Sequence, residues 1–180
     1  EVKRVTYQEE IKWIVENERR NQFISNLTKN INGNTLLLFN YVDSHGKPLY
    51  ELIKKKCPDK KVFLIHGGTE VGLREEIRKI VDSEEDAILV ASYGTCSTGI
   101  NIRNIHNIVF ASPSKSVIRV LQSIGRGLRK SSNKDSVKLY DICDDLCYKK
   151  YVNHTFKHMN ERIKIYINEK FDYDTTNIRL

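Results

Sequence analysis

Residues 87–112 read AILVASYGTCSTGINIRNIHNIVFAS, in which two short apolar runs enclose a polar segment. Both runs, at 87–92 and 107–112, are apolar at nearly every position, as is typical of strands covered on both faces of a parallel sheet. Three further runs of strand length share this character: TLLLF at 35–39, VFLIH at 62–66 and VKLYDI at 137–142. We therefore expect a mostly parallel sheet whose strands are buried.

Helical patterns lie between most of these runs, at 47–56, 73–81 and 116–130. Alternation of strands and helices is typical of a doubly wound α/β protein, in which helices flank the sheet on both sides. The fold class predicted from the residues is therefore α/β.

Both ends of the chain also favour helices. Thr6 followed by Glu9 has the pattern of a capping box, which opens a helix predicted over about 7–30. A long C-terminal helix is predicted over about 143–170, followed by a tail or an edge strand at 171–180. No linker, repeat or low-complexity segment divides the chain, so residues 1–180 are interpreted as one domain.

Composition and charge narrow the class of protein. Hydrophobic residues make up 39% of the chain and charged residues 29%, as in soluble globular domains. No apolar run approaches the roughly 20 residues of a membrane span, and the unevenly spaced cysteines predict reduced thiols in a cytoplasmic protein. The net charge is +7, with seven basic residues against one acid between Lys115 and Lys138. A polyanionic partner and a merely solvated basic face explain this charge equally well.

Ligands of open α/β sheets bind beside the carboxyl ends of the strands, so the loops that follow the strands are the first place to look. Small and hydroxyl residues dominate these loops, which suits backbone and hydroxyl contacts with phosphates. A polar loop without a ligand would have a similar composition. The loops read NYVDSHG at 40–46, GGTEVG at 67–72, YGTCSTGINIRN at 93–104 and PSKS at 113–116.

The stretch LQSIGRGLRK at 121–130 places two glycines where a helix displays arginines, although each glycine costs a helix about 1 kcal/mol against alanine. On a helix, one face packs on the sheet and the neighbouring face presents guanidinium groups that fit phosphate oxygens. A basic helix end that complements the helix dipole is the alternative, which the glycines disfavour. The packing face holds Ile118, Leu121, Gly125 and Leu128, and the polar face holds Arg119, Gln122, Arg126 and Arg129.

Cysteine and histidine recur on one stripe of the predicted C-terminal helix, at Cys143, Cys147, His154 and His158. Cys143 and His158 would stand about 22 Å apart on a continuous helix. One metal ion cannot bind all four residues, so no metal site is predicted and packing is the favoured interpretation. The chain also has no GxxxxGK[ST] phosphate loop, no GxGxxG after a strand and no strand that ends in Asp-Glu to hold Mg²⁺.

Four segments together resemble the second RecA-like domain of superfamily 2 helicases. Residues 36–53, 62–77, 88–116 and 120–130 resemble motif IV, the motif IVa region, motif V and motif VI of that family. Motif VI, with Gln122, Gly125, Arg126 and Arg129, is the most specific of the four. The resemblance implies a single RecA-like domain with a mostly parallel sheet flanked by helices.

The resemblance also implies roles for individual residues. Arg126 and Arg129 would act as arginine fingers toward the γ-phosphate of ATP, and Gln122, Gly99 and Asn101 would lie on the nucleotide side. ATP and Mg²⁺ would be held mainly by the first domain, so this chain is expected to be inactive alone. The residues expected to contact a nucleic-acid strand are Asn40, Tyr41, His66, Gly67, Ser92, Thr95 and Ser97.

The family implies a motor domain of an ATP-dependent DNA helicase that remodels branched DNA and RNA–DNA hybrids in recombination, repair and replication control. Its partners would be DNA and the N-terminal RecA-like domain of the same protein. Two alternatives from other classes stay open. One is a stand-alone basic nucleic-acid-binding module without an ATPase role. The other is a different doubly wound enzyme, such as a transferase, which the missing glycine fingerprint disfavours.

Overall fold

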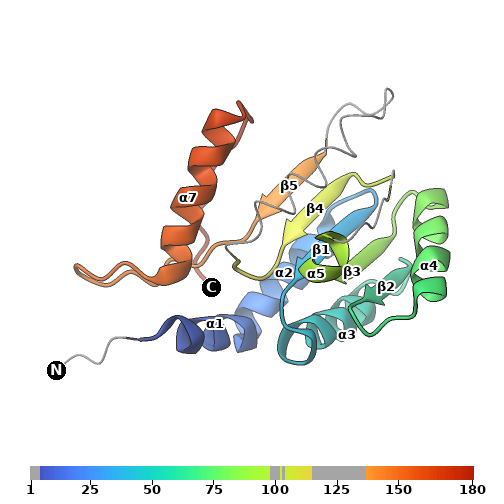
Figure 1. Cartoon of the computed structure of the whole chain (residues 1–180), viewed down its shortest axis with the longest axis horizontal. Coiled ribbons are helices and arrows are strands. Elements are labelled where there is room, and N and C mark those ends of the chain that lie inside the picture. Colours follow the sequence, from blue (N-terminus) through green and yellow to red (C-terminus); the bar gives the residue numbers. More distant parts are fainter. Residues whose placement is uncertain (1–4, 98–101, 103, 115–136) are drawn as a thin grey trace.

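The computed structural model describes residues 5–97, 102, 104–114 and 137–180. Its strands form one five-stranded sheet in the order β2-β3-β1-β4-β5, and every neighbouring pair is parallel (Figure 1). The α/β class and all five predicted strands are confirmed. The strands are β1 (Thr35–Phe39), β2 (Val62–Ile65), β3 (Ile88–Ser92), β4 (Asn107–Phe110) and β5 (Lys138–Asp141).

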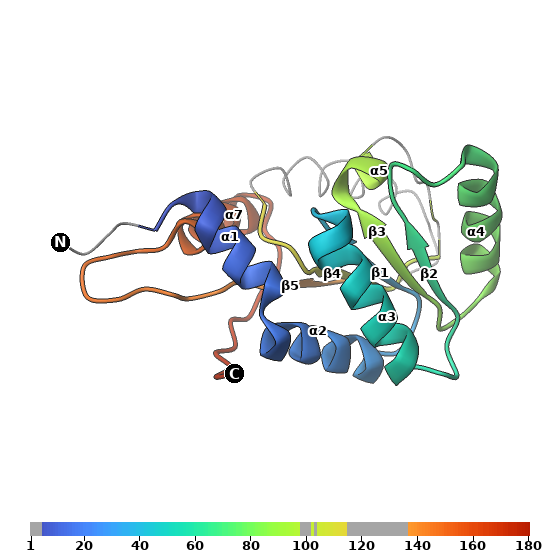
Figure 2. The same ribbon diagram turned by 90° about the horizontal axis from the view of Figure 1, so that it is seen from below.

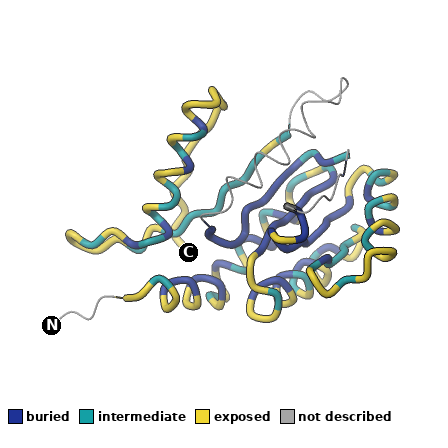
Figure 3. The backbone as a smooth tube through the Cα atoms, in the orientation of Figure 1, coloured by how far each residue is buried: buried dark blue, intermediate teal, exposed yellow. Residues whose placement is uncertain are grey.

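Burial follows the position of each strand in the sheet. β1, β3 and β4 are buried along their whole length, because a strand lies on either side of each and helices cover the sheet. The edge strands β2 and β5 are only partly buried. Figure 3 shows the buried centre and the more exposed periphery. The uniformly apolar sequences of the inner strands therefore reflect burial on both faces.

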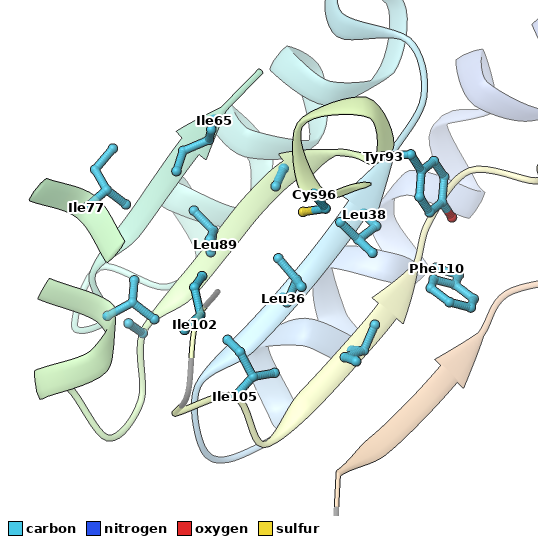
Figure 4. Close-up of a cluster of buried hydrophobic side chains, with 14 residues drawn as sticks. Leu36, Leu38, Ile65, Ile77, Leu89, Tyr93, Cys96, Ile102, Ile105 and Phe110 are labelled. Atoms are coloured by element: carbon cyan, nitrogen blue, oxygen red, sulfur yellow. The ribbon is translucent and has the colours of Figure 1, made fainter. Parts of the chain in front are cut away.

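Helices cover both faces of the sheet, as the alternation of patterns predicts. α2 (Glu18–Asn30) and α3 (Lys47–Lys56) pack on one face, and α4 (Val71–Ser83) and α5 (Tyr93–Ser97) pack on the other (Figure 2). Alternate residues of β1 enter opposite layers, since successive side chains of a strand point to opposite faces. Leu36 and Leu38 join Ile77 and Cys96 (Figure 4), whereas Leu37 and Phe39 join Ile24, Leu49 and Ile53.

The N-terminal helix expected over about 7–30 is two helices, α1 (Tyr7–Glu16) and α2, which are separated at Asn17. Asn17 is extended, and its side chain accepts a hydrogen bond of 3.0 Å from the backbone N–H of Arg20. Asparagine is among the best N-cap residues, so it begins a new helix here. The capping box of Thr6 and Glu9 is confirmed at the start of α1.

The long C-terminal helix expected over about 143–170 is wrong at its start, because α7 spans His154–Asn168 and residues 143–153 are not helical. The physical reason is a cap from the other end of the chain. The carboxylate of Glu10, in α1, accepts hydrogen bonds from the backbone N–H groups of His154 (2.9 Å) and Thr155 (2.7 Å). The first N–H groups of a helix lack partners inside it, and Glu10 supplies one. Residues 171–180 form a tail without a strand.

α7 is joined to the sheet by a buried ion pair at the end of β5. Asp141 accepts hydrogen bonds from Arg162 Nε (2.7 Å), Arg162 Nη2 (2.8 Å) and the hydroxyl of Tyr166 (2.9 Å). A two-pronged contact between guanidinium and carboxylate fixes orientation as well as distance. α1, residues 143–153 and α7 therefore form a layer beside the sheet, which we call the α1–α7 layer.

Candidate nucleic-acid interface at the carboxyl edge of the sheet

The carboxyl ends of β1, β2, β3 and β4 lie side by side, so the loops that follow them emerge at one edge of the sheet. The register between neighbouring strands establishes this, because the last residues of the strands are paired or lie one residue from a pair. The pairs are Phe39 with Ser92, Ile65 with Ala91, and Leu38 with Phe110. We call this region the carboxyl edge.

Ser112, just after β4, forms hydrogen bonds with several of the loops at the carboxyl edge. It is buried, and its Oγ lies 3.0 Å from the backbone nitrogen of Asn40 and 2.7 Å from Nδ1 of His45. Its backbone oxygen accepts a hydrogen bond of 2.9 Å from the hydroxyl of Tyr93, and burial raises the pKa of that phenol so that it stays a donor. Ser112 thus ties the loops after β1, β3 and β4 together.

The hydrogen bonds of His45 determine which tautomer it adopts. Nδ2 of Asn21 donates to the backbone oxygen of Val15 at 2.9 Å, so the Oδ1 of Asn21 faces Nε2 of His45 at 3.1 Å. An amide oxygen only accepts, so Nε2 carries the proton and Nδ1 accepts from the hydroxyl of Ser112. The Ser112 oxygen in turn accepts the N–H of Asn40. Every polar atom in this chain of contacts has a partner.

The charge state of His45 agrees with this tautomer. Burial, helped by the positive charge of Arg20, lowers the pKa of His45 from 6.5 to about 3. The imidazole is therefore neutral at physiological pH, as its accepting Nδ1 requires. Arg20 itself donates from Nη1 to the backbone oxygen of Ala111 (2.8 Å) and pairs through Nε with Asp144 (2.7 Å). His45 is a fixed structural group at the base of the edge.

The loop after β1 presents Asn40 and Tyr41, and both are exposed. A π-helical turn, η1 (Val42–Gly46), follows and leads directly into α3. Gly46 is required there because a Cβ atom would overlap the ring of Phe39. Asn40 and Tyr41 therefore lie at the carboxyl edge, and their contact with a nucleic-acid strand stays a prediction.

Ser92 and Thr95 also lie at the carboxyl edge, but their hydroxyl groups face each other. The two oxygens are 2.7 Å apart, and the Oγ of Ser92 accepts from the backbone N–H of Thr95 at 3.4 Å. Both residues are buried. In this state they shape the first turn of α5, the helix that also contains Ser97. Their mutual contact uses the proton of only one of the two hydroxyls.

The loop after β2 places His66 and Gly67 at the same edge. The backbone N–H of His66 donates to the hydroxyl of Thr69 at 3.0 Å, and Nδ1 of His66 accepts from the N–H of Gly68 at 3.1 Å. Arg74, from α4, donates to the backbone oxygens of Gly67 (2.9 Å) and Thr69 (2.7 Å). These bonds fix a turn on which Gly67 is exposed.

Five of the residues expected at the site lie outside the described residues. They are Gln122, Arg126 and Arg129 of the basic helix pattern, together with Gly99 and Asn101 of the hydroxyl loop. The basic residues from Lys115 to Lys134 also lie outside the described residues, whereas Lys138 begins β5 and is exposed. The placement of these arginines therefore stays a prediction.

The predicted stripe of cysteines and histidines does not form, because α7 begins only at His154. Cys143 and Cys147 lie in the non-helical segment, where their thiols contact Thr155 O (3.9 Å) and Asn153 Oδ1 (3.4 Å). His154 and His158 instead pack against the ring of Tyr7, with centroids 5.9 and 5.5 Å apart. Within the described residues, no group of three or more His, Cys, Asp or Glu is placed to hold a metal ion. No helix in those same ranges is long and apolar enough to cross a membrane.

The residues that hold the carboxyl edge in place from below carry no recognisable signal in the sequence. Asn21, His45 and Ser112 act together, yet they are separated by 24 and 67 positions along the chain. Neither spacing nor residue type marks them as partners, because asparagine, histidine and serine are common in loops and helix ends. The pairing of Arg20 with Asp144 is equally remote in the sequence.

The class of protein follows from the all-parallel sheet, the helices on both faces and the converging loops at the carboxyl edge: this is the RecA-like α/β fold of helicase C-terminal domains. Residues 18–131 match the family model of the helicase conserved C-terminal domain, and the chain belongs to that family.

Similar proteins agree with this assignment. The chain is 37% identical, over 97% of its length, to the ATP-dependent DNA helicase uvsW of Enterobacteria phage T4, of which it spans 37%. The crystal structure of T4 UvsW superposes with a TM-score of 0.79 at 38% identity, covering 96% of this chain and 37% of that one. The C-terminal domain of the DEAD-box protein Dbp5, at 13% identity and a TM-score of 0.61 over 86% of this chain and 82% of that one, shares the fold.

Proposed function

We propose that this chain is the C-terminal motor domain of an ATP-dependent DNA helicase and that it acts with an N-terminal RecA-like domain. The observation that carries the proposal is the match of residues 18–131 to the helicase family on a fold whose carboxyl edge presents Asn40, Tyr41 and Gly67 from fixed loops. The +7 net charge favours a polyanionic partner. The likeness to a phage DNA helicase makes DNA the nucleic acid we propose.

Different residues would contact the nucleotide and the DNA strand. Arg126 and Arg129 approach the γ-phosphate of ATP as arginine fingers, and Gln122, Gly99 and Asn101 lie on the nucleotide side. Bound ATP with Mg²⁺ supplies the hydrolysis that drives the motor, and both are held mainly by the N-terminal domain. Contacts with the nucleic-acid strand come from Asn40, Tyr41, His66 and Gly67, and from the hydroxyls of Ser92, Thr95 and Ser97.

The substrates we propose are branched DNA and RNA–DNA hybrids, in recombination, repair and control of replication. The similarity to the phage T4 helicase supports this choice. The location we propose is the cytoplasm, that of the host cell if the protein is encoded by a phage. A panel of forks, four-way junctions and RNA–DNA hybrids, unwound by the two-domain protein, tests it. Equal rates on simple duplexes and on branched substrates would remove the preference.

Two ATPase measurements test the motor proposal itself. The chain alone should hydrolyse no ATP, with or without DNA, because it has no phosphate loop and phosphoryl transfer needs one together with a bound metal ion. The protein that joins this chain to the N-terminal domain should show DNA-stimulated turnover. Robust DNA-stimulated hydrolysis by the purified chain alone would contradict the division of labour. If the two-domain protein bound DNA but showed no hydrolysis, a nucleic-acid-binding module would be the better description.

A further inference from the structure

An exposed turn at residues 148–151 stands apart from the carboxyl edge and is not used by the proposed motor contacts. Tyr148 and Tyr151 close it with two backbone hydrogen bonds, Tyr148 N–H to Tyr151 O at 3.0 Å and Tyr151 N–H to Tyr148 O at 2.9 Å. Lys149 takes a left-handed conformation with φ of 52°. In Figures 1 and 2 the segment between β5 and α7 extends away from the sheet, on the side of α1. We call residues 148–151 the Tyr148 turn.

The base of the Tyr148 turn is held by buried contacts. Asn153, which is buried, accepts from the N–H of Leu146 (3.0 Å) and donates to the backbone oxygen of Asp144 (3.0 Å). Its Nδ2 also lies 3.0 Å from the carboxylate of Glu10. Asp145 accepts from the N–H of Cys147 at 3.0 Å. The turn is therefore presented from a fixed base, which lowers the entropy that a ligand must remove.

The tip of the turn combines an open aromatic ring with two cations. Tyr148 is 70% exposed, and Lys149 and Lys150 are exposed beside it. Nζ of Lys149 lies 5.3 Å from the centre of the Tyr148 ring. The two acids nearest in sequence do not neutralise these lysines by pairing with them, because Asp144 pairs with Arg20 and Asp145 bonds the backbone of Cys147. An exposed ring flanked by ammonium groups fits a ligand with both a flat face and negative charge.

We propose that the Tyr148 turn is a contact site for single-stranded DNA. The ring of Tyr148 stacks on one base, and Lys149 and Lys150 neutralise phosphates next to it. A single strand fits better than a duplex, because only an unpaired base offers its face to the ring. Stacking of this kind is independent of sequence, as a motor that moves along any sequence needs. The inference rests on the proposed function, since it takes DNA to be the polymer that this domain meets.

Substitutions in the two-domain helicase test the site through the binding of a fluorescent oligo(dT) without nucleotide. Tyr148→Ala should weaken binding about 10-fold, within the range measured for loss of one stacked base, whereas Tyr148→Phe should bind as the wild type does. Tyr173→Ala removes another exposed tyrosine, far along the chain, and should leave affinity unchanged. Because Tyr148 is exposed, the melting temperature of Tyr148→Ala should equal that of the wild type. Equal affinity of Tyr148→Ala and the wild type would overturn the stacking contact.

The lysines are tested by the salt dependence of the same binding. Replacing Lys149 and Lys150 together by alanine should make the slope of log Kd against log salt shallower by about 1.4, since each phosphate contact on a single strand contributes about 0.7. Lys54→Ala is the matched control. Lys54 also lies over a tyrosine ring, that of Tyr50 at 5.4 Å, but it sits in the last turn of α3, toward the opposite edge of the sheet. A slope that changes no more than in Lys54→Ala would overturn the phosphate contacts.

Photo-crosslinking locates the contact directly. An oligonucleotide that carries 5-iododeoxyuridine should crosslink to the peptide containing Tyr148, and an equal length of duplex should compete poorly. Crosslinks found only on other peptides, or a Tyr148 turn that captures an acidic protein but no oligonucleotide, would overturn the proposal. DNA-stimulated ATPase activity is measured on the same preparations. Normal stimulation with no effect of Tyr148→Ala refutes the turn alone, whereas absent stimulation in the wild type refutes the proposed motor function.

Discussion

The carboxyl edge and the α1–α7 layer differ in how their polar groups are hydrogen-bonded. At the carboxyl edge, hydrogen bonds converge on Ser112, and even the hydroxyls of Ser92 and Thr95 bond each other. In the α1–α7 layer, Glu10 accepts hydrogen bonds from Asn153 and from the first N–H groups of α7, whereas the side chain of Tyr148 is exposed. Chemical type alone is therefore a poor guide to contact, because partners inside the protein decide which polar groups remain available.

The two regions also differ in how firmly they are attached to the sheet. The carboxyl edge is part of the sheet, so its loops inherit the fixed spacing of paired strands. The α1–α7 layer is joined to that sheet through Asp141 and Arg162, and it carries its own exposed turn. A catalytic group needs the first kind of support, whereas a strand contact tolerates the second.

The largest effect should come from the two arginines that are predicted to act as arginine fingers. In the two-domain protein, Arg126→Ala or Arg129→Ala should lower kcat for ATP by on the order of 10³-fold, the contribution of an arginine finger to phosphoryl transfer. Lysine should restore little activity, because a point charge lacks the two-pronged fork. Lys54→Ala, the control in α3, should leave kcat unchanged. If kcat at saturating DNA stays near wild type in both arginine variants, the stretch is only a basic patch.

In the α1–α7 layer, Glu10 should matter most for stability. Burial alone would raise the pKa of its carboxyl, but the hydrogen bonds from Thr155, Asn153 and His154 together lower it. Glu10→Ala leaves the backbone N–H groups of His154 and Thr155 without the acceptor that caps α7, so the free energy of unfolding should fall by about 3 kcal/mol. Urea unfolding monitored by circular dichroism measures this. Glu16→Ala, at an exposed position of the same helix, is the control, and a loss no larger than the control's would contradict the capping role.

At the carboxyl edge, the buried His45 should make stability depend on pH. Its pKa is lowered from 6.5 to about 3, so between these values the unfolded chain binds a proton that the native chain does not. Acidification below 6.5 therefore destabilises the fold, with a slope that approaches about 1.4 kcal/mol per pH unit, and above 6.5 this contribution vanishes. His45→Gln should remove that slope. Unfolding free energies of both proteins at pH 7.5, 6.0 and 5.0 give the difference, and parallel pH profiles would refute it.

The smallest effect should follow the loss of one hydroxyl at the same edge. Ser112→Ala removes the donor to His45 and the acceptor for the N–H of Asn40, which should cost about 1–2 kcal/mol of unfolding free energy. Ser114, also buried and only two positions away, offers the comparison variant Ser114→Ala. If Ser112→Ala is as stable as the wild type, the hydrogen bonds at Ser112 do not hold the edge together.

Much of the fold was decided by local sequence. The runs that became β1, β3 and β4 have the length of strands, and their apolar residues at nearly every position indicate burial on both faces of the sheet. Thr6 and Glu9 form their capping box within one turn. The helix pattern at 73–81 likewise became α4, which extends it by two residues at each end. Such signals are local, since they depend on residues at most a few positions apart. The family motifs are local too, which is why the resemblance to helicases could be stated from the residues.

The tertiary structure alone decided where α7 begins and which polar groups are occupied. Glu10 caps α7 from the other end of the chain, 144 positions away from His154, whereas the break at Asn17 is local, because its side chain caps the N–H of Arg20 three positions later. The hydroxyl oxygens of Ser92 and Thr95, which the sequence predicts to contact phosphates, lie 2.7 Å from each other in the folded chain. The physical reason is that a helix N-terminus or a hydroxyl takes whichever partner the folded chain brings within about 3 Å. Sequence distance carries no information about that partner, so the strands were predictable and the hydrogen-bond network was not.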